Sequence, residues 1–596
     1  MEKTYTIKDF LEVQSAGDAS FSPDGSQVAY LSNRTGTSQI FLVATDGAEP
    51  EQITDFGDHI SFVRFSPTQN VLLFGKAEGG NEQTQLYLLD LGDRSIVNVT
   101  NAPNTRHDVG SWSSDGKRIC FASNERNGAD FDVYVMDVVS LEKRRVFDQG
   151  EWCAAEGFSP LGTYVVVRQK HSNTDTDLYL CNLQTGSIEH ITPHSGNVVF
   201  CNVLWLPDES AFLLIQDHDR EFKGLARYTL ASKSFEYVLT PDWDIESAVI
   251  SKDGTTVSVV VNENGYEHAA VYDTRAFTVL PYHVPQGNTY RVRFSEDGSR
   301  LVFSLGGSRR TSDIWILNLE TREPHQLTHS YQGVPPEAMV EPELIQYKSF
   351  DGPSISAFMY MPKNKHSSSR TPVVINIHGG PEAQYQPSYQ PVMQYLVYSG
   401  YAVIAPNIRG SAGYGKTFLS LDDVEKRPDS IKDVVALREY IISRPDVNQA
   451  KIALYGASYG GYMVLACLAF YPKLWAAAVD IVGIANFVTF LENTAPYRRA
   501  LREAEYGSLE KDRDLLQRIS PIHAIEHIEA PLCIIHGAND PRVPLSEAEQ
   551  VVARLKELGR HVELLVYPDE GHGISKLCNK LDAYPKIIDF LNKALL

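Results

Sequence analysis

Residues 451–467 read Lys451-Ile452-Ala453-Leu454-Tyr455-Gly456-Ala457-Ser458-Tyr459-Gly460-Gly461-Tyr462-Met463-Val464-Leu465-Ala466-Cys467. An apolar run short enough for a buried strand meets a serine bracketed by glycines, and an apolar run compatible with a helix follows. This is the G-x-S-x-G nucleophile elbow in its strand–turn–helix setting. Glycines are needed there because the turn is sharp and brings the backbone close to a neighbouring strand and helix. The stretch predicts that Ser458 is a nucleophile.

Two further candidate residues each follow a predicted strand. Residues 532–536 form an apolar run that leads to Asp540, and residues 562–567 form another that leads to His572. Taken singly, Asp540 is typical of a turn and His572 of a loop. The order Ser458, Asp540, His572 is that of the α/β-hydrolase fold, and the carboxyl ends of parallel strands meet at one sheet edge. Together the three residues predict a catalytic triad.

A serine nucleophile also needs hydrogen-bond donors for the oxyanion that forms during attack. One candidate is the backbone N–H of Tyr459, which directly follows the serine. The other is the N–H of Gly380, in the segment Asn376-Ile377-His378-Gly379-Gly380-Pro381 after an earlier predicted strand. We expect His378 and His536 to make structural hydrogen bonds and to take no part in catalysis.

The carboxyl-terminal half predicts an α/β-hydrolase domain over residues 331–596. Short apolar strands alternate with helices, which is typical of a doubly wound, mostly parallel sheet. We expect strands at residues 372–377, 402–405, 452–455, 477–481, 532–536 and 562–567, and helices that include residues 430–443, 462–470, 546–558 and 580–595.

The amino-terminal half contains a repeat that predicts an all-β, seven-bladed β-propeller over residues 18–330. A large apolar residue followed by a Ser-Pro-Asp-Gly-like turn recurs at positions 21, 65, 112, 158, 205, 250 and 294, at intervals of 44 to 47 residues. Strands with tight turns at this period are typical of propeller blades, whereas chance hairpins in a β-sandwich would not be so evenly spaced. Residues 1–17 precede the repeat, and residues 6–13 predict a short amphipathic helix that needs an apolar partner.

Composition narrows the choice of partners and compartment. The 596 residues carry 54 basic and 75 acidic side chains, a net charge of −21, which argues against nucleic acid or an anionic membrane as a partner. The seven cysteines are scattered and form no C-x-x-C pair, which favours a reducing compartment over a disulfide framework or a zinc site. With no leader-like start and no long apolar run, the sequence predicts a cytoplasmic location. We expect no metal and no cofactor.

The order of a propeller followed by a hydrolase domain, with motifs at residues 378–381, 407–415, 456–461, 540–544 and 570–573, resembles the prolyl oligopeptidase family of serine peptidases. Within that family the chain is most similar to the acylaminoacyl peptidase (acyl-peptide hydrolase) branch. The resemblance extends over nearly the whole chain.

The resemblance implies a role for each site residue. Ser458 would attack the scissile carbonyl, His572 would transfer the proton, and Asp540 would hold the imidazole, with Gly380 and Tyr459 as oxyanion donors. Arg542 would contact a substrate carbonyl. Ile484 and Phe487 would line an apolar specificity pocket, although core packing explains them almost as well. The amino-terminal helix would dock on the hydrolase domain, and the propeller would cap the site and admit only short peptides.

Several functions remain open. The leading hypothesis is removal of N-acylated residues from short peptides. In the family that the chain resembles, the dipeptidyl-peptidase branch holds a free amine with a glutamate pair in its propeller, and no Glu-Glu pair is present in this sequence. A broader oligopeptidase or a carboxylesterase would use the same triad. A binding protein with an inactive hydrolase domain is a more distant alternative. A homodimer is a further expectation, since a terminal helix and a sheet edge could each mediate self-association.

Overall fold

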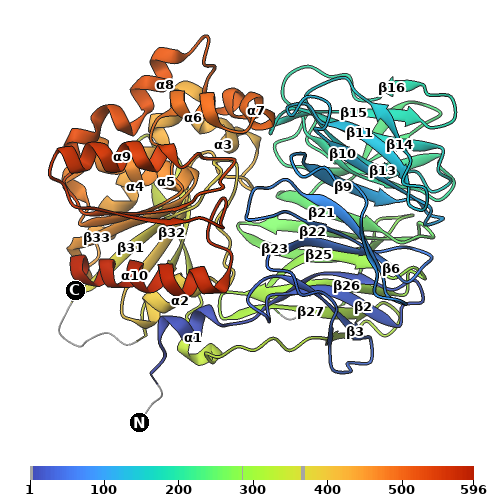
Figure 1. The fold of residues 1–596 in the computed structure, drawn as a ribbon, viewed down its shortest axis with the longest axis horizontal. Coiled ribbons are helices and arrows are strands. Elements are labelled where there is room, and N and C mark those ends of the chain that lie inside the picture. The colour runs from blue at the N-terminus through green and yellow to red at the C-terminus, as the bar shows by residue number, and fades with distance from the viewer. Residues whose placement is uncertain (1–3, 283, 285, 364–369) are drawn as a thin grey trace.

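The computed structural model describes residues 4–282, 284, 286–363 and 370–596. The chain forms two domains that lie side by side (Figure 1): a ring of antiparallel sheets, and a single large sheet with helices on both faces. None of the helices in these residue ranges is both long and apolar enough to cross a bilayer. All seven cysteines are free; five are buried, Cys201 is half-buried and Cys578 is exposed.

Seven four-stranded antiparallel sheets form the propeller in the described part of the chain. In order they are β1–β4 (residues 16–52), β5–β8 (60–98), β9–β12 (107–147), β13–β16 (152–190), β17–β20 (200–239), β21–β24 (244–280) and β25–β28 (288–326). In every sheet the residue that opens the sequence repeat is the last residue of the first strand, from Phe21 in β1 to Phe294 in β25. The repeat therefore marks the hairpin between the first two strands of each blade.

The hairpin chemistry explains why the repeat has its composition. The Ser22 hydroxyl donates to Asp24 (2.6 Å) and accepts from the Gln27 N–H (3.0 Å), while Gly25 has φ +67°. This left-handed conformation favours glycine, and the aspartate caps the turn. Serine and aspartate pair in the same way in the blades that begin at residues 107, 244 and 288.

Ion pairs help to close the ring between its first, second and last blades. Asp18 of the first blade is only 6% exposed and accepts from Arg64 of the second blade (2.8 Å) and from Arg293 of the last (3.2 Å). Burial alone would raise the pKa of Asp18, but Arg64, Arg293 and Arg291 outweigh it and lower the pKa. The first and last blades share no strand within the described residues, so side chains hold the ring together there.

The second domain is built on an eight-stranded sheet. Its order is β29 (Glu343–Lys348), β30 (Ser354–Tyr360), β32 (Ala402–Asn407), β31 (Thr371–Ile377), β33 (Val447–Ala457), β34 (Ala477–Ile481), β35 (Leu532–Gly537) and β36 (Val562–Tyr567). At one edge of the sheet β29 pairs antiparallel with β30, and β30 pairs antiparallel with β32; the six strands from β32 to β36 are parallel to one another. This is the α/β-hydrolase fold that the sequence predicts.

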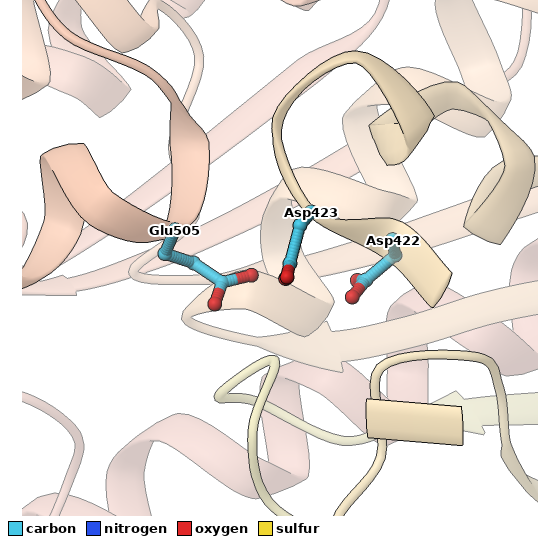
Figure 2. Close-up of side chains that lie close together, drawn as sticks. All are labelled: Asp422, Asp423 and Glu505. Carbon is cyan, nitrogen blue, oxygen red and sulfur yellow. The ribbon is translucent and has the colours of Figure 1, made fainter. Parts of the chain in front are cut away.

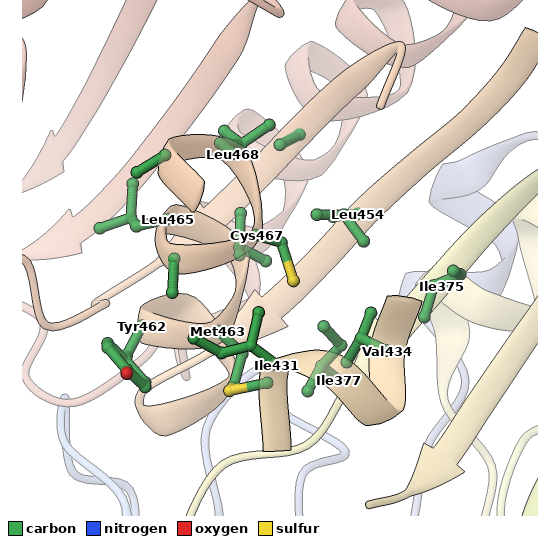
Figure 3. Packing of buried hydrophobic residues seen from close by; sticks show 14 of the residues in the cluster. Ile375, Ile377, Ile431, Val434, Leu454, Tyr462, Met463, Leu465, Cys467 and Leu468 are labelled. Atoms are coloured by element: carbon green, nitrogen blue, oxygen red, sulfur yellow. The ribbon is translucent and has the colours of Figure 1, made fainter. Parts of the chain in front are cut away.

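Helices cover both faces of this sheet. On one face lie α4 (Arg427–Ile442), α5 (Tyr459–Phe470) and α9 (Ser546–Glu557); on the other lie α1 (Ile7–Leu11), α2 (Pro391–Tyr398) and α10 (Leu577–Leu595). Figure 3 shows side chains of α4, α5 and β33 interlocking on the first face, with Met463 and Leu454 among them. Three helices that we did not predict follow β34: α6 (Phe487–Asn493), α7 (Pro496–Tyr506) and α8 (Arg513–Ile519).

The amino-terminal helix α1 packs on the hydrolase domain. Thr6 and Asp9 form a capping box at its start, and Ile7 and Leu11 join the apolar cluster that contains α2 and α10. Phe10 is fully buried and its ring lies 5.5 Å from Tyr395 and 5.7 Å from Tyr398. A five-residue helix is not stable alone, so this apolar contact stabilises it.

We therefore expect Phe10→Ala to lower the temperature of the first thermal unfolding transition. Truncation of a buried phenylalanine typically costs about 3–5 kcal/mol. Lys8→Ala, on the exposed side of the same helix, is the matched control and should leave the transition unchanged. An equal effect of both changes on differential scanning calorimetry would contradict the packing role of Phe10.

Candidate active site

The serine lies on the sharp turn between β33 and α5. Ser458 has φ +59° and ψ −119°, and its N–H donates to the Ile481 carbonyl at 2.8 Å. A Cβ on Gly456 would lie 2.3 Å from the Gly460 oxygen, and one on Gly460 would lie 2.1 Å from the Ile377 oxygen. Both neighbouring atoms are backbone and cannot move aside, so only glycine fits on either side of the serine. The elbow holds Ser458 in a conformation that a non-glycine residue seldom adopts.

Asp540 and His572 come together beyond the ends of the next strands. The Nδ1 of His572 lies 2.6 Å from the Asp540 carboxylate, whose side chain is completely buried. The N–H groups of Arg542 and Val543 donate to the other carboxylate oxygen at 2.8 and 3.1 Å. A carboxylate accepts hydrogen bonds, so the imidazole carries its proton on Nδ1 and Nε2 is left to act as a base.

Backbone hydrogen bonds place these side chains at one sheet edge. Ser458 is tied to the end of β34, the Val482 N–H donates to Ile535 in β35, and the Ala538 N–H donates to Tyr567 at the end of β36. No direct hydrogen bond joins Ser458 to His572, both of which the structure describes. Catalytic hydrogen bonds are often long without substrate, so this does not argue against the pair.

The predicted oxyanion loop touches the elbow. A Cβ on Gly379 would lie 3.2 Å from the Ser458 Cβ, and Gly380 has φ +135°. Arg502 and Tyr506 of α7 hold the Gly380 carbonyl at 3.4 and 3.5 Å.

The two histidines that we expected to be structural make internal contacts. His378 is hydrogen-bonded through Nε2 to Ser411 at 2.8 Å, and its Nδ1 lies 2.7 Å from the Gly379 carbonyl. His536 is fully buried and donates from Nε2 to the Val543 carbonyl at 2.9 Å.

A buried ionic network anchors the other predicted oxyanion residue. The Tyr459 hydroxyl lies 2.9 Å from Ser430 and 3.1 Å from both Asp422 and Arg427. Arg427, fully buried, also pairs with Asp422 and Glu505. The ring of Tyr459, which follows the predicted nucleophile, is therefore fixed, and with it the start of α5.

Asp422, Asp423 and Glu505 turn their carboxylates toward one another (Figure 2), with one oxygen of each within 4.8 Å of the others. Oxygen-rich clusters of this kind can hold a divalent cation. Here the Arg427 guanidinium already pairs with Asp422 and Glu505. Burial, together with the nearby Glu505, raises the pKa of Asp423 to about 6. The cluster is thus matched to a guanidinium, and the absence of a metal remains a prediction.

The predicted substrate-binding residues fall into two groups. Arg542 pairs with Glu82 of the propeller at 2.5 Å, and both line a cavity of about 390 Å³ between the domains that reaches His572. Ile484 and Phe487 are instead 2% and 0% exposed in the hydrolase core. The Phe487 ring packs against Tyr462 and Tyr506 behind the elbow. Their role in specificity stays a prediction.

Sequence reasoning missed several residues beside the site. Glu82 and Arg106 of the propeller line the same cavity, and Arg502 and Tyr506 of α7 contact the oxyanion loop. Propeller loops carry no motif that says which of them face the hydrolase domain. The helix α7 did carry a signal, since Pro496 stands at its first position and Gly507 follows its last.

Comparisons with known proteins agree with the two-domain fold described above. Residues 387–596 match the model of the prolyl oligopeptidase family, and residues 18–192 match that of the TolB beta propeller domain. Dipeptidyl peptidase family member 6 of Caenorhabditis elegans is 23% identical over 97% of this chain and 84% of its own length. Acylamino-acid-releasing enzyme of Homo sapiens is 27% identical over 50% of this chain and 41% of its own length. The structure of Pyrococcus horikoshii acylaminoacyl peptidase superposes with a TM-score of 0.77 and 20% identity, covering 100% of this chain and 98% of that one.

Fold and elbow define a propeller-capped serine hydrolase of the α/β-hydrolase class. Its carboxyl-terminal domain belongs to the prolyl oligopeptidase family of serine peptidases.

A carboxyl group that the triad does not use lies beneath the elbow. Asp480 of β34 is 1% exposed, and a Cβ on Gly461 of α5 would lie 2.3 Å from its carboxylate. Burial raises the pKa of Asp480 to about 7. Because the folded-state pKa lies above the unfolded value near 4, the carboxylate destabilises the fold as pH rises from about 4 to about 7.

We predict that Asp480→Asn stabilises the protein more at pH 8 than at pH 5. From the shift in pKa, the relieved penalty is roughly 2 kcal/mol at pH 5 and roughly 4 kcal/mol at pH 8. Thermal midpoints at the two pH values measure the difference, with exposed Asp514→Asn as control. A gain or loss that does not change with pH would show that Asp480 does not titrate in this way.

Proposed function

We propose that the protein is a serine peptidase that removes N-acylated amino acids from short peptides. Ser458 attacks the scissile carbonyl while His572 Nε2 takes the hydroxyl proton, and Asp540 stabilises the imidazolium. His572 then protonates the leaving amine, and water releases the acyl group from Ser458 by the reverse proton path. The N–H groups of Gly380 and Tyr459 bind the oxyanion. The observation that carries this proposal is the 2.6 Å His572–Asp540 pair at the sheet edge where the elbow presents Ser458.

The charges at the site support a substrate without a free amine. A free ammonium group needs carboxylates to bind it. Glu82 is already paired with Arg106 and Arg542, and Glu382 with Arg502 and Asn173. An acylated amino terminus carries no charge and needs neither carboxylate. The likeness to acylamino-acid-releasing enzyme points the same way, whereas the likeness to a dipeptidyl peptidase supports the alternative of a free-amine substrate.

Close contact between the domains supports short substrates. A Cβ on Gly571, next to His572, would lie 1.9 Å from the Gly80 oxygen of the propeller. The main chain of the propeller therefore contacts the loop that carries His572, and the cavity beside this loop has a volume of about 390 Å³. That volume suits a small ligand and excludes a folded protein.

The direct test compares N-acetyl-leucine p-nitroanilide with unblocked leucine p-nitroanilide. We expect a strong preference for the acetylated compound, and no turnover of either by Ser458→Ala. Preference for the free amine would favour a dipeptidyl- or aminopeptidase instead. Turnover of p-nitrophenyl esters alone would favour the carboxylesterase alternative.

A further inference from the structure

The unpredicted helix α7 lies between the two loops that carry the active site. At its start, the Ala495 N–H donates to the Pro541 carbonyl at 3.0 Å and the Thr494 hydroxyl donates to the Arg542 carbonyl at 2.7 Å. Two turns later, Arg502 donates to the Gly380 carbonyl. Residues four apart share a helix face, so the intervening Arg498 faces the same interior space. Figure 1 shows α7 at the edge of the hydrolase domain that faces the propeller.

Arg498 has no anionic partner there. The structure gives its guanidinium no hydrogen bond or ion pair to any described residue, and its Nε is buried and unsatisfied. Burial, with the nearby Arg542 and Arg502, lowers the pKa of Arg498 to about 10. An arginine in this position stays charged at neutral pH, here without a carboxylate in hydrogen-bond or ion-pair contact.

A second unpaired cation approaches from the propeller. Lys170 lies on β14 (Tyr164–Ser172), the strand against which α7 packs, with its Nζ 6.0 Å from the centre of the Trp152 ring. Trp152 in turn contacts Tyr497, the neighbour of Arg498, at 5.6 Å. No hydrogen bond or ion pair joins the Lys170 ammonium group to any residue that the structure describes. Burial, with Arg168 nearby, lowers the pKa of Lys170 to about 8.

The carboxylates around these cations are already engaged by other groups. Glu382 pairs with Arg502 at 3.3 Å and accepts from Asn173, and Glu82 is shared between Arg106 and Arg542. The space between the domains thus holds an excess of positive charge in a protein whose net charge is −21. Half-buried cations without a counter-ion favour the binding of an anion.

We propose that Arg498 and Lys170 form a subsite for a carboxylate of the bound peptide. The inference deepens the proposed function, on which it rests, by adding a negative charge to the substrate class. A short acyl peptide brings a carboxylate either at its own carboxyl terminus or on an acidic side chain. Arg498 offers the fork of N–H donors that suits a carboxylate, and Lys170 adds a second charge. The same cations would repel the ammonium of an unblocked peptide.

Binding to the inactive Ser458→Ala protein tests the subsite without requiring hydrolysis. Isothermal titration calorimetry would compare three ligands: acetyl-Leu-Ala, acetyl-Leu-Ala-amide and acetyl-Leu-Glu-amide. We expect at least one of the two acids to bind about tenfold more tightly than the neutral amide, and the preference to weaken with added salt. The acid that gains tells whether the terminal or the side-chain carboxylate occupies the subsite.

Variants in the same background locate the effect. Arg498→Met should bring the acid-to-amide ratio close to 1, and Arg498→Lys should restore part of it. Lys170→Met should reduce it. Arg499→Met is the matched control, since Arg499 donates instead to the Glu492 carbonyl, and it should keep the full ratio. Equal binding of all three ligands, or a ratio that survives Arg498→Met, would overturn the subsite. Loss of the proposed function would appear separately, as failure of the active enzyme to cleave the acetylated anilide.

Discussion

The structure depends on contacts between main-chain atoms at the elbow. Gly456 approaches the Gly460 carbonyl, and Gly460 approaches the Ile377 carbonyl, at separations that no Cβ could enter. These contacts let β33 turn directly into α5 with the serine at the outside of the turn. The oxyanion loop follows β31, the neighbour of β33, so the same contact brings it against Ser458. One steric constraint thus sets the positions of Ser458, of the first turn of α5 and of Gly380.

A second steric contact, between Gly571 of the hydrolase domain and Gly80 of the propeller, brings the two domains together. It places a propeller loop against the histidine loop, and Glu82 in that loop region then reaches Arg542 across the boundary. Propeller side chains therefore supply part of the charge that lines the cavity beside His572.

Much of this could be read from the sequence, for reasons that are local. The Ser-Pro-Asp-Gly turn requires a capping aspartate and a left-handed glycine, so it leaves a repeat that can be counted. The proximity of Ser458, Asp540 and His572 was predictable because each follows a parallel strand, and these strands end at the same edge of the sheet. Contacts across the domain boundary were not predictable in this way, because Asn173 and Glu382, or Glu82 and Arg542, are hundreds of residues apart and neither pair carries a motif. The roles of Ile484 and Phe487 could not be decided from the sequence, because the same apolar residue types line pockets and fill cores.

The cationic side chains on the two sides of the elbow differ in whether they all have counter-ions. Behind it, Arg427 is matched by Asp422 and Glu505, a closed set that satisfies a buried cation and holds Tyr459. In front of it, toward the propeller, Arg502 and Arg542 are matched while Arg498 and Lys170 are not. A partly buried charge without a counter-ion costs free energy unless something else binds it. The matched network therefore accounts for structure alone, and the unmatched charges lie on the side that a substrate would occupy.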